Sequence, residues 1–190
     1  MPRVIAARSE AEAVRLFLEP FQEAIAAFAE NIIFTQSRPD PKTRIRALNV
    51  ARDDVVMLQD ALGEVRLALG IKMGFRTVLL PGPPKRWIVE TKKYLYHLEE
   101  PRVPVRELVG YHWHPEVPGI SFPHIHMLAA AAPARRMHVA IPHATIKEVL
   151  TTAMRDYDVV PFPSYLHNWE ALVHVADETI RASLQPGSTP

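Results

Sequence analysis

Two pairs of histidines with the spacing His-x-His are the clearest chemical signal in the chain. The first pair is His112 and His114, and the second pair, twelve residues further along, is His124 and His126. Residues i and i+2 of a β-strand project to the same face, and neighbouring strands lie ~4.8 Å apart. If the two segments are paired strands, the imidazoles lie within about 10 Å of one another. The sequence therefore predicts a shared histidine pocket.

Clustered imidazoles of this kind support two chemistries. In the first, three or four of these histidines bind a divalent ion such as Zn²⁺, Mn²⁺ or Fe²⁺, which activates a water molecule. His138, on the next predicted strand, could supply a further ligand. In the second, no metal is bound, and one imidazole is the general base while another is the general acid across a phosphodiester. The spacing alone leaves both open, together with a chance cluster of ordinary strand histidines.

Pairs of basic residues near the ends of the predicted strands are candidate phosphate contacts. Aromatic residues interleave with these pairs, and basic groups combined with stackable rings on a sheet suit single-stranded RNA. Tyr111 and Trp113 alternate with the first histidine pair, so we expect them to face the core instead. The residues that we expect to bind phosphate charge are Lys93, Arg135 and Arg136.

The composition excludes several classes of function. The chain has 190 residues, a net charge of +1 and no cysteine. The lack of cysteine excludes disulfides, thiol catalysis and thiolate-bound zinc, and the small net charge gives no global attraction to nucleic acid. No apolar run approaches the ~18–20 residues of a membrane span, and the first residues lack the features of a secretion signal. We therefore expect a cytoplasmic protein without a membrane partner.

The first part of the sequence predicts a long helical hairpin over residues 1–72. Apolar residues recur at alternating spacings of three and four from Ala11 to Ile32, and again from Leu48 to Leu69. Such spacing places one apolar stripe along a helix, and the segment SRPDPK between the stripes is typical of a turn. The stripes have more apolar neighbours than one seam covers. These would pack on the chain's own sheet, or form a homo-oligomer seam or a docking site for a partner protein.

The remainder, residues 73–185, predicts a core domain of strands followed by helices. The segments from GFRTVLL to MHVAIP have the alternation of neighbouring antiparallel strands, and the alternate apolar residues of KYLYHLEE share one face. The sequence TIKE, which begins at Thr145, matches a helix capping box, and a last helix is expected from about Trp169 to Leu184. We therefore predict the α+β class, with an antiparallel four- to five-stranded sheet, C-terminal helices, the N-terminal helical hairpin and a frayed tail at 186–190.

The order of these segments resembles the TumE-type toxins of bacterial toxin–antitoxin systems. The resemblance covers residues 87–150 and rests on a Tyr-x-Tyr strand (KYLYHLEE), a strand that ends in YHWHPE, and the segment FPHIH. It implies a small α+β fold and a ribonuclease that is held inactive by a cognate antitoxin. By resemblance, His124 and His126 are the first catalytic candidates, followed by His112 and His114. The His-x-His spacing of the second pair is shorter than the family pattern.

Three functions are compatible with these patterns. The first is a His-dependent phosphodiesterase, namely a toxin-like ribonuclease with RNA as its substrate. The second is a metal-dependent hydrolase or oxygenase that acts on a small molecule. The third is a non-catalytic interaction subunit of a bacterial complex, in which the N-terminal helices bind an antitoxin, another protein or a second copy of the chain.

Overall fold

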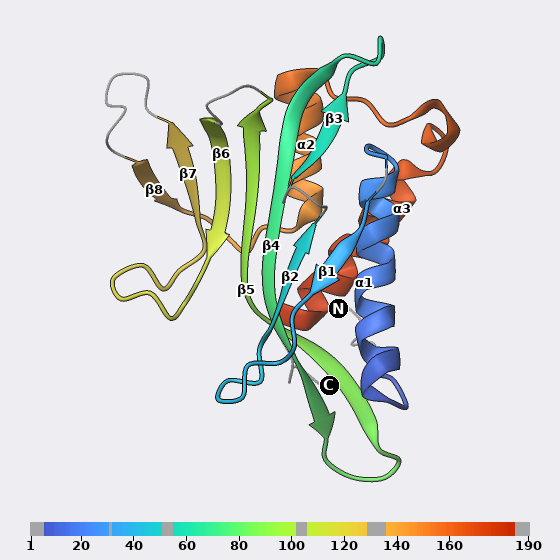
Figure 1. Cartoon of the computed structure of the whole chain (residues 1–190), viewed down its shortest axis with the longest axis vertical. Helices are drawn as coiled ribbons and strands as arrows, with labels where there is room; N and C mark the ends of the chain where they lie inside the picture. The colour runs from blue at the N-terminus through green and yellow to red at the C-terminus, as the bar shows by residue number, and fades with distance from the viewer. Residues whose placement is uncertain (1–5, 31, 51–54, 102–105, 129–135, 185–190) are drawn as a thin grey trace.

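The described part of the chain folds as three α-helices packed on one large antiparallel sheet, which confirms the predicted α+β class. The computed structural model describes residues 6–30, 32–50, 55–101, 106–128 and 136–184. The helices are α1 (Glu10–Ala26), α2 (Ile146–Tyr157) and α3 (Trp169–Leu184), with a 3-10 turn at Pro163–Tyr165. The strands are β1 (Phe34–Gln36), β2 (Arg46–Val50), β3 (Val55–Gln59), β4 (Val65–Leu80), β5 (Arg86–Glu100), β6 (Arg106–Trp113), β7 (His124–Leu128) and β8 (Arg136–Ala140) (Figure 1).

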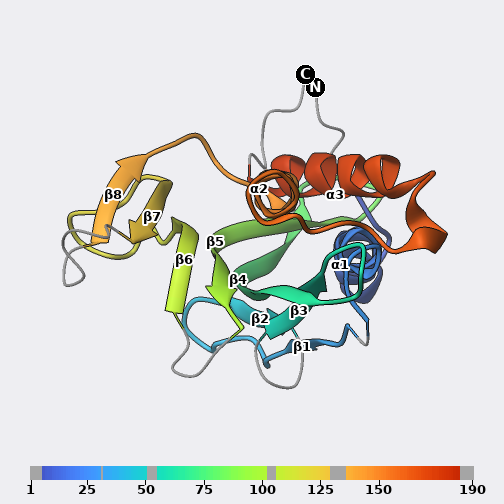
Figure 2. The ribbon, with the colours of Figure 1, turned by 90° about the horizontal axis from the view of Figure 1, so that it is seen from above.

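The sheet is centred on two long strands and extends on both sides of them. Its order is β1-β2-β4-β5-β6-β7-β8, with β3 paired to part of β4, and every pairing is antiparallel. The central strands, β4 and β5, have 16 and 15 residues. Figure 2 shows the helices on one side of β4 and β5, whereas β7 and β8 extend beyond α1 and α3. The sheet therefore has a helix-covered half and a projecting arm.

The apolar core lies between the helices and one face of the central strands. Tyr94, Tyr96 and Leu98 alternate along β5 and are fully buried, as the alternation in KYLYHLEE predicts. Phe21 of α1 is also buried, and its ring centroid lies 6.4 Å from that of Tyr96. Burial of apolar surface at ~25 cal/mol per Å² is the main stabilisation of such a layer. One face of β5 therefore packs in the core.

Both predicted C-terminal helices are present at their predicted positions. The side chain of Thr145 accepts a hydrogen bond from the backbone N–H of Lys147 at 3.3 Å, and the Glu148 carboxylate accepts one from the Thr145 N–H at 2.7 Å. These reciprocal bonds are the capping box at the start of α2. α3 runs over Trp169–Leu184. Local signals of this kind are satisfied within a few residues, which is why the sequence predicts them well.

The prediction that the second apolar stripe forms a helix is wrong. α1 takes up the first apolar stripe as far as Ala26, but the second stripe forms β2, β3 and the beginning of β4. A turn interrupts any helix there, because the Asp60 carboxylate accepts two backbone N–H groups at 2.8 and 3.0 Å and Gly63 adopts a φ of 79°. Apolar residues also recur at every second position in parts of this stripe, and these side chains become buried when the segments pair in the sheet. The residues of that pattern are Leu48, Val50, Val56, Leu58, Leu67, Leu69 and Ile71.

This difference enlarges the sheet and removes the predicted domain boundary. The sheet has eight strands in the described residues rather than four to five. The predicted division between 1–72 and 73–185 falls inside β4, so both parts share one sheet. The expected docking surface of two long helices does not form, because α1 packs against α3 and β5 instead. The predicted tail at 186–190 lies outside the described residues. None of the helices in the described ranges combines the length and the apolar character of a membrane span.

Candidate metal centre

The alternation of β6 separates its core residues from its histidines. Tyr111 is buried on the helix side, where its hydroxyl lies 2.7 Å from Thr152 Oγ1 of α2. Trp113 packs partly buried against the same core. Because successive residues of a strand point to opposite faces, His112 and His114 lie on the other side of the sheet. The prediction that Tyr111 and Trp113 face the core is confirmed.

The register of the sheet places the histidines of four strands side by side. His112 of β6 pairs with His124 of β7, and His126 of β7 pairs with His138 of β8. On the other side of β6, His97 of β5 occupies the same row as His126, with a glycine of β6 between them. The result is a patch of imidazoles across β5 to β8. We call this patch the histidine cluster: His97, His112, His114, His124, His126 and His138.

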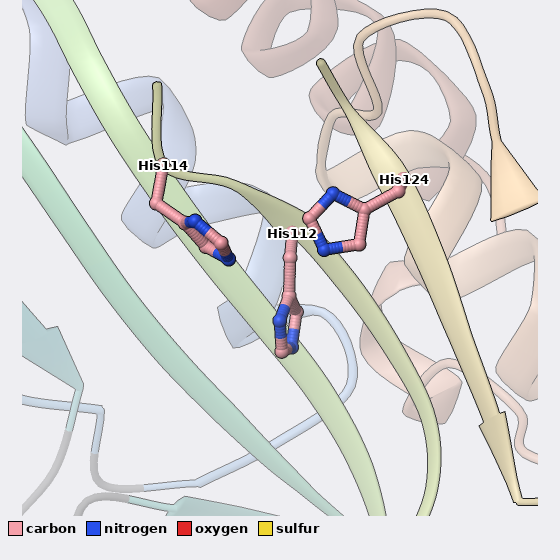
Figure 3. A group of neighbouring side chains, drawn as sticks. All are labelled: His112, His114 and His124. Atoms are coloured by element: carbon pink, nitrogen blue, oxygen red, sulfur yellow. The ribbon is translucent and has the colours of Figure 1, made fainter. Parts of the chain in front are cut away.

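Ring distances show that the predicted histidines form one group. The ring centroid of His112 lies 4.0 Å from that of His126, and the centroid of His124 lies 4.9 Å from His126. His114 is 5.1 Å from His124, and His138 is 4.4 Å from His126. Figure 3 shows His112 and His114, from the end of β6, beside His124 from β7. The structure thus brings together the four predicted histidines and His138, although their roles stay a prediction.

His124 and His126 have the geometry of two ligands that share one ion. Nδ1 of His124 lies 2.9 Å from the backbone carbonyl of Phe122, which can only accept, so Nδ1 carries the proton. Nε2 of His124 therefore carries the lone pair, and it lies at hydrogen-bond distance, 3.1 Å, from Nε2 of His126. Two nitrogens bound to one ion at ~2.1 Å lie about 3–3.4 Å apart. The carbonyl that fixes the ring is the outer partner that metal-binding histidines usually have.

Burial favours the neutral form of two inner histidines, His112 and His124. His124, His112 and His126 are 0%, 4% and 6% exposed. Burial, followed by repulsion from the neighbouring imidazoles, lowers the pKa of His112 from 6.5 to about 2. Burial also lowers the pKa of His124, against the opposing effect of the Phe122 carbonyl. Neutral imidazole is the form that binds a metal ion.

Three buried imidazole nitrogens in the cluster have no hydrogen-bond partner among the described residues. They are Nε2 of His97, Nε2 of His112 and Nδ1 of His114. Buried polar atoms are nearly always paired, and an unpaired one commonly indicates a ligand, an ion or a water molecule. The donor set of the cluster therefore fits a divalent transition-metal ion. Three overlapping groups of three residues place their ligand atoms within 4.8 Å of one another: His112, His114 and His124; His124, His126 and His138; and His97, Glu107 and His112.

Glu107 was not predicted from the sequence, and the reason is a β-bulge. Strict alternation places residue 107 on the same face as Tyr111, which is the core side. In the structure Glu99 pairs with Glu107 while Leu98 pairs with Val109, so Leu108 is an additional residue on β6. The bulge moves Glu107 to the face of the cluster. Its Oε2 lies 3.3 Å from Nδ1 of His97, and its Oε1 lies 3.7 Å from Nδ1 of His126.

His97 and Gly110 also belong to the site, and the sequence contained a signal for each. His97 alternates with the core residues of β5, so its face follows from them. Gly110 is an isolated glycine inside a strand, which indicates a close approach. A Cβ atom there would lie 2.7 Å from Nε2 of His112 and 2.9 Å from Oε1 of Glu107. With any other residue at this position, the ring of His112 or the carboxylate of Glu107 would have to move from its observed place.

The structure describes fewer of the predicted phosphate-binding side chains than of the predicted histidines. Lys93 of β5 forms an ion pair with Glu116 at 2.8 Å, two residues after His114, so this pair borders one end of the cluster. Arg136 is the first residue of β8, but its side chain is outside the described part of the structure. Arg135 lies outside the described residues. Of the three basic residues, Lys93 alone has a described side chain.

Comparison of the chain with models of known protein families, with curated proteins and with solved structures finds no match. The resemblance to TumE-type toxins therefore stays a prediction.

Proposed function

We propose that this protein is a metal-dependent hydrolase whose ion is held by His124, His126 and His138. The observation that carries the proposal is the 3.1 Å separation of the two Nε2 atoms of His124 and His126, with His124 oriented by a backbone carbonyl. His138 completes the group within 4.8 Å. Imidazole ligands of this kind suit Zn²⁺, Mn²⁺ and Fe²⁺.

The burial pattern supports a reactive rather than a purely structural centre. His124 and His126 are buried, whereas His138 on β8 is exposed. A site with three protein ligands and one exposed side leaves a position for water or substrate. In such a centre the ion supplies a nucleophile at neutral pH by lowering the pKa of a bound water molecule. The protein's own contribution is to hold the imidazoles in place and, by burial, to lower the pKa of His124 so that it stays unprotonated.

The metal-free alternative has less support from the geometry. Acid–base catalysis by two histidines requires one of them to be protonated near the working pH. Burial lowers the pKa of His112 and of His124. Neither is then suited to donate a proton as an imidazolium. The buried nitrogens without hydrogen-bond partners also favour an ion over a proton relay.

For the substrate we propose a phosphodiester, with single-stranded RNA as the first to test. Metal-activated water is a common nucleophile for phosphoryl groups. Lys93 lies at the His114 end of the cluster, where its ammonium group would attract a phosphate. A cognate antitoxin as a partner is a proposal that depends on the resemblance to TumE-type toxins. A small-molecule ester is the competing substrate class.

The test uses untagged protein that has been freed of metal by a chelator and then reloaded with Zn²⁺, Mn²⁺ or Fe²⁺. We expect reloading to restore cleavage of a single-stranded RNA oligonucleotide. His124→Ala should reduce cleavage, and the affinity for the ion held by His124, His126 and His138, at least 100-fold. His174→Ala is the matched control, since His174 is 61% exposed on α3, away from the cluster.

Two results would contradict the proposal. Full cleavage by the chelated protein would exclude a metal-dependent reaction. Failure of the folded protein to bind any of the three ions would exclude the centre itself. Ion binding without cleavage of RNA, but with hydrolysis of a small ester, would move the substrate to the competing class. Circular dichroism of His124→Ala establishes whether the variant is folded, and His124→Gln repeats the test with less loss of volume.

A further inference from the structure

We infer that the histidine cluster binds a second divalent ion, at a position formed by His97, Glu107 and His112. This inference rests on the proposed function, because it adds to the centre on His124, His126 and His138. The ligand atoms of the second group lie within 4.8 Å of one another. The two groups share no residue, so both positions can be complete at the same time.

The inner end of this second position is a buried nitrogen without a partner. Nε2 of His112 has no hydrogen-bond partner among the described residues, and the side chain is 96% buried, since its relative exposure is 4%. Nε2 of His97 is also a buried atom without a hydrogen-bond partner among the described residues, although the side chain as a whole is 23% exposed. The two rings stack with centroids 4.8 Å apart and planes at 20°. Buried polar atoms are nearly always paired, and an unpaired one commonly indicates a ligand or an ion. A cation held beside Glu107 would give Nε2 of His112 a partner.

The carboxylate is positioned beside these nitrogens by two separate features of β6. The bulge at Leu108 turns Glu107 to the cluster face. Gly110 then leaves the space in which Oε1 of Glu107 and Nε2 of His112 approach the strand, each within 3.0 Å of the place where a Cβ would stand. A bulge and a glycine are both unfavourable in the middle of a strand. Their combination at one point indicates a built site.

The chemistry of the second group differs from that of the first. Two imidazoles and one carboxylate form the ligand set that suits Fe²⁺, Mn²⁺ or Zn²⁺ with open positions. Glu107 lies between the residues of the two positions: its Oε2 is 3.3 Å from Nδ1 of His97, and its Oε1 is 3.7 Å from Nδ1 of His126, the ring nitrogen opposite the Nε2 that faces His124. Paired ions in hydrolases lie ~3.5–4 Å apart and stabilise both the attacking and the leaving oxygen. A two-ion centre therefore favours phosphodiester cleavage over the hydrolysis of a simple ester.

The experiment is a titration of metal-free, untagged protein with Zn²⁺, read by calorimetry and by elemental analysis after gel filtration. We expect two ions per chain for the unchanged protein. Glu107→Gln and Gly110→Ala should each bind one ion, with at least a tenfold loss of affinity at the second position. His124→Ala should also bind one ion, which is then held by the second position.

Two controls separate a specific loss from general damage. Glu116→Gln removes a carboxylate that also borders the cluster but pairs with Lys93, and it should still bind two ions. Thermal unfolding of Gly110→Ala establishes whether the altered strand is folded, and Glu107→Gln, which keeps the volume of the side chain, tests the same position independently.

The outcomes distinguish this inference from the proposed function. One ion per chain, unchanged in Glu107→Gln and Gly110→Ala and lost in His124→Ala, would overturn the second position and leave the first intact. Loss of all binding in His124→Ala would overturn the separation of the two positions. No binding by the unchanged protein would overturn both proposals.

Discussion

The two faces of β5 and β6 treat buried polar atoms in opposite ways. On the helix side the Tyr94 hydroxyl accepts a hydrogen bond from the backbone N–H of Ala144 at 2.9 Å, and Thr91 contacts Ser183 at 2.7 Å. The exceptions on that side are the Tyr96 hydroxyl and Nδ1 of His143, whose ring packs against Trp113. On the cluster side three imidazole nitrogens have no partner in the described part of the chain.

This contrast indicates which face stabilises the fold and which face is prepared for a ligand. On a face that serves only to stabilise the fold, hydrogen-bonded polar atoms and buried apolar surface increase the stability. A face that binds a ligand holds polar atoms in place before the ligand arrives, at a cost in stability. The same two strands serve both purposes because their side chains alternate.

The largest expected effect is on the helix side. Phe21→Ala should lower the free energy of unfolding by ~3–5 kcal/mol, because it removes a fully buried ring and leaves a cavity. Chemical denaturation followed by circular dichroism measures this loss. The Zn²⁺ stoichiometry of the folded fraction should stay the same. A stability loss below 1 kcal/mol would show that the two faces are not divided as described.

A smaller effect is expected from pH on the metal-free protein. The pKa of His112 is about 2 in the folded chain and 6.5 as its ordinary value, so the unfolded chain binds more protons in acid. This stability is fully present above pH 6.5 and is lost as the pH falls, by at most ~1.4 kcal/mol per pH unit. Denaturation in chelator between pH 7 and pH 5 measures it.

The control for this pH effect is a pair of histidine variants. His112→Phe should flatten the dependence, whereas His174→Ala should leave it unchanged, because His174 is exposed. Equal stability of the unchanged protein at pH 7 and pH 5 would contradict the burial of a neutral His112.

The smallest expected effect comes from one hydrogen bond. Tyr111→Phe removes the 2.7 Å contact with Thr152 and should lower the free energy of unfolding by ~1 kcal/mol. Because Tyr111 faces the helices, the Zn²⁺ affinity should change less than twofold. A larger change in affinity would mean that the two faces of β6 are coupled.

The sequence predicted the parts of the molecule that depend on short-range patterns. The capping box at Thr145 and the helix Trp169–Leu184 are local, and the pairing of the two His-x-His segments follows from a short connection. The residues of the second apolar stripe fit the period of a helix and the period of a strand at once, so the pattern alone predicts a helix wrongly. Pairing of β2 and β3 with β4, and of β4 with β5, makes these residues strands.

The candidate site was predictable as far as strict alternation holds. His112, His114, His124 and His126 obey it, and so does His97. Glu107 does not, because a single additional residue at Leu108 reverses its face. Nothing in the sequence marks the position of that bulge, and the role of Gly110 emerges only with the rings that approach it.

The position of His138 has a consequence for how an ion would enter and leave. β8 is the last strand of the sheet order and is held along one side by β7. Strands at such a border open more readily than central ones, and their amide protons exchange sooner. His138, the outermost of the three proposed ligands, thus lies on an edge strand of the sheet. An ion bound to His138 would hold β8 in the sheet, and the opening of β8 would set the rate at which the ion is released.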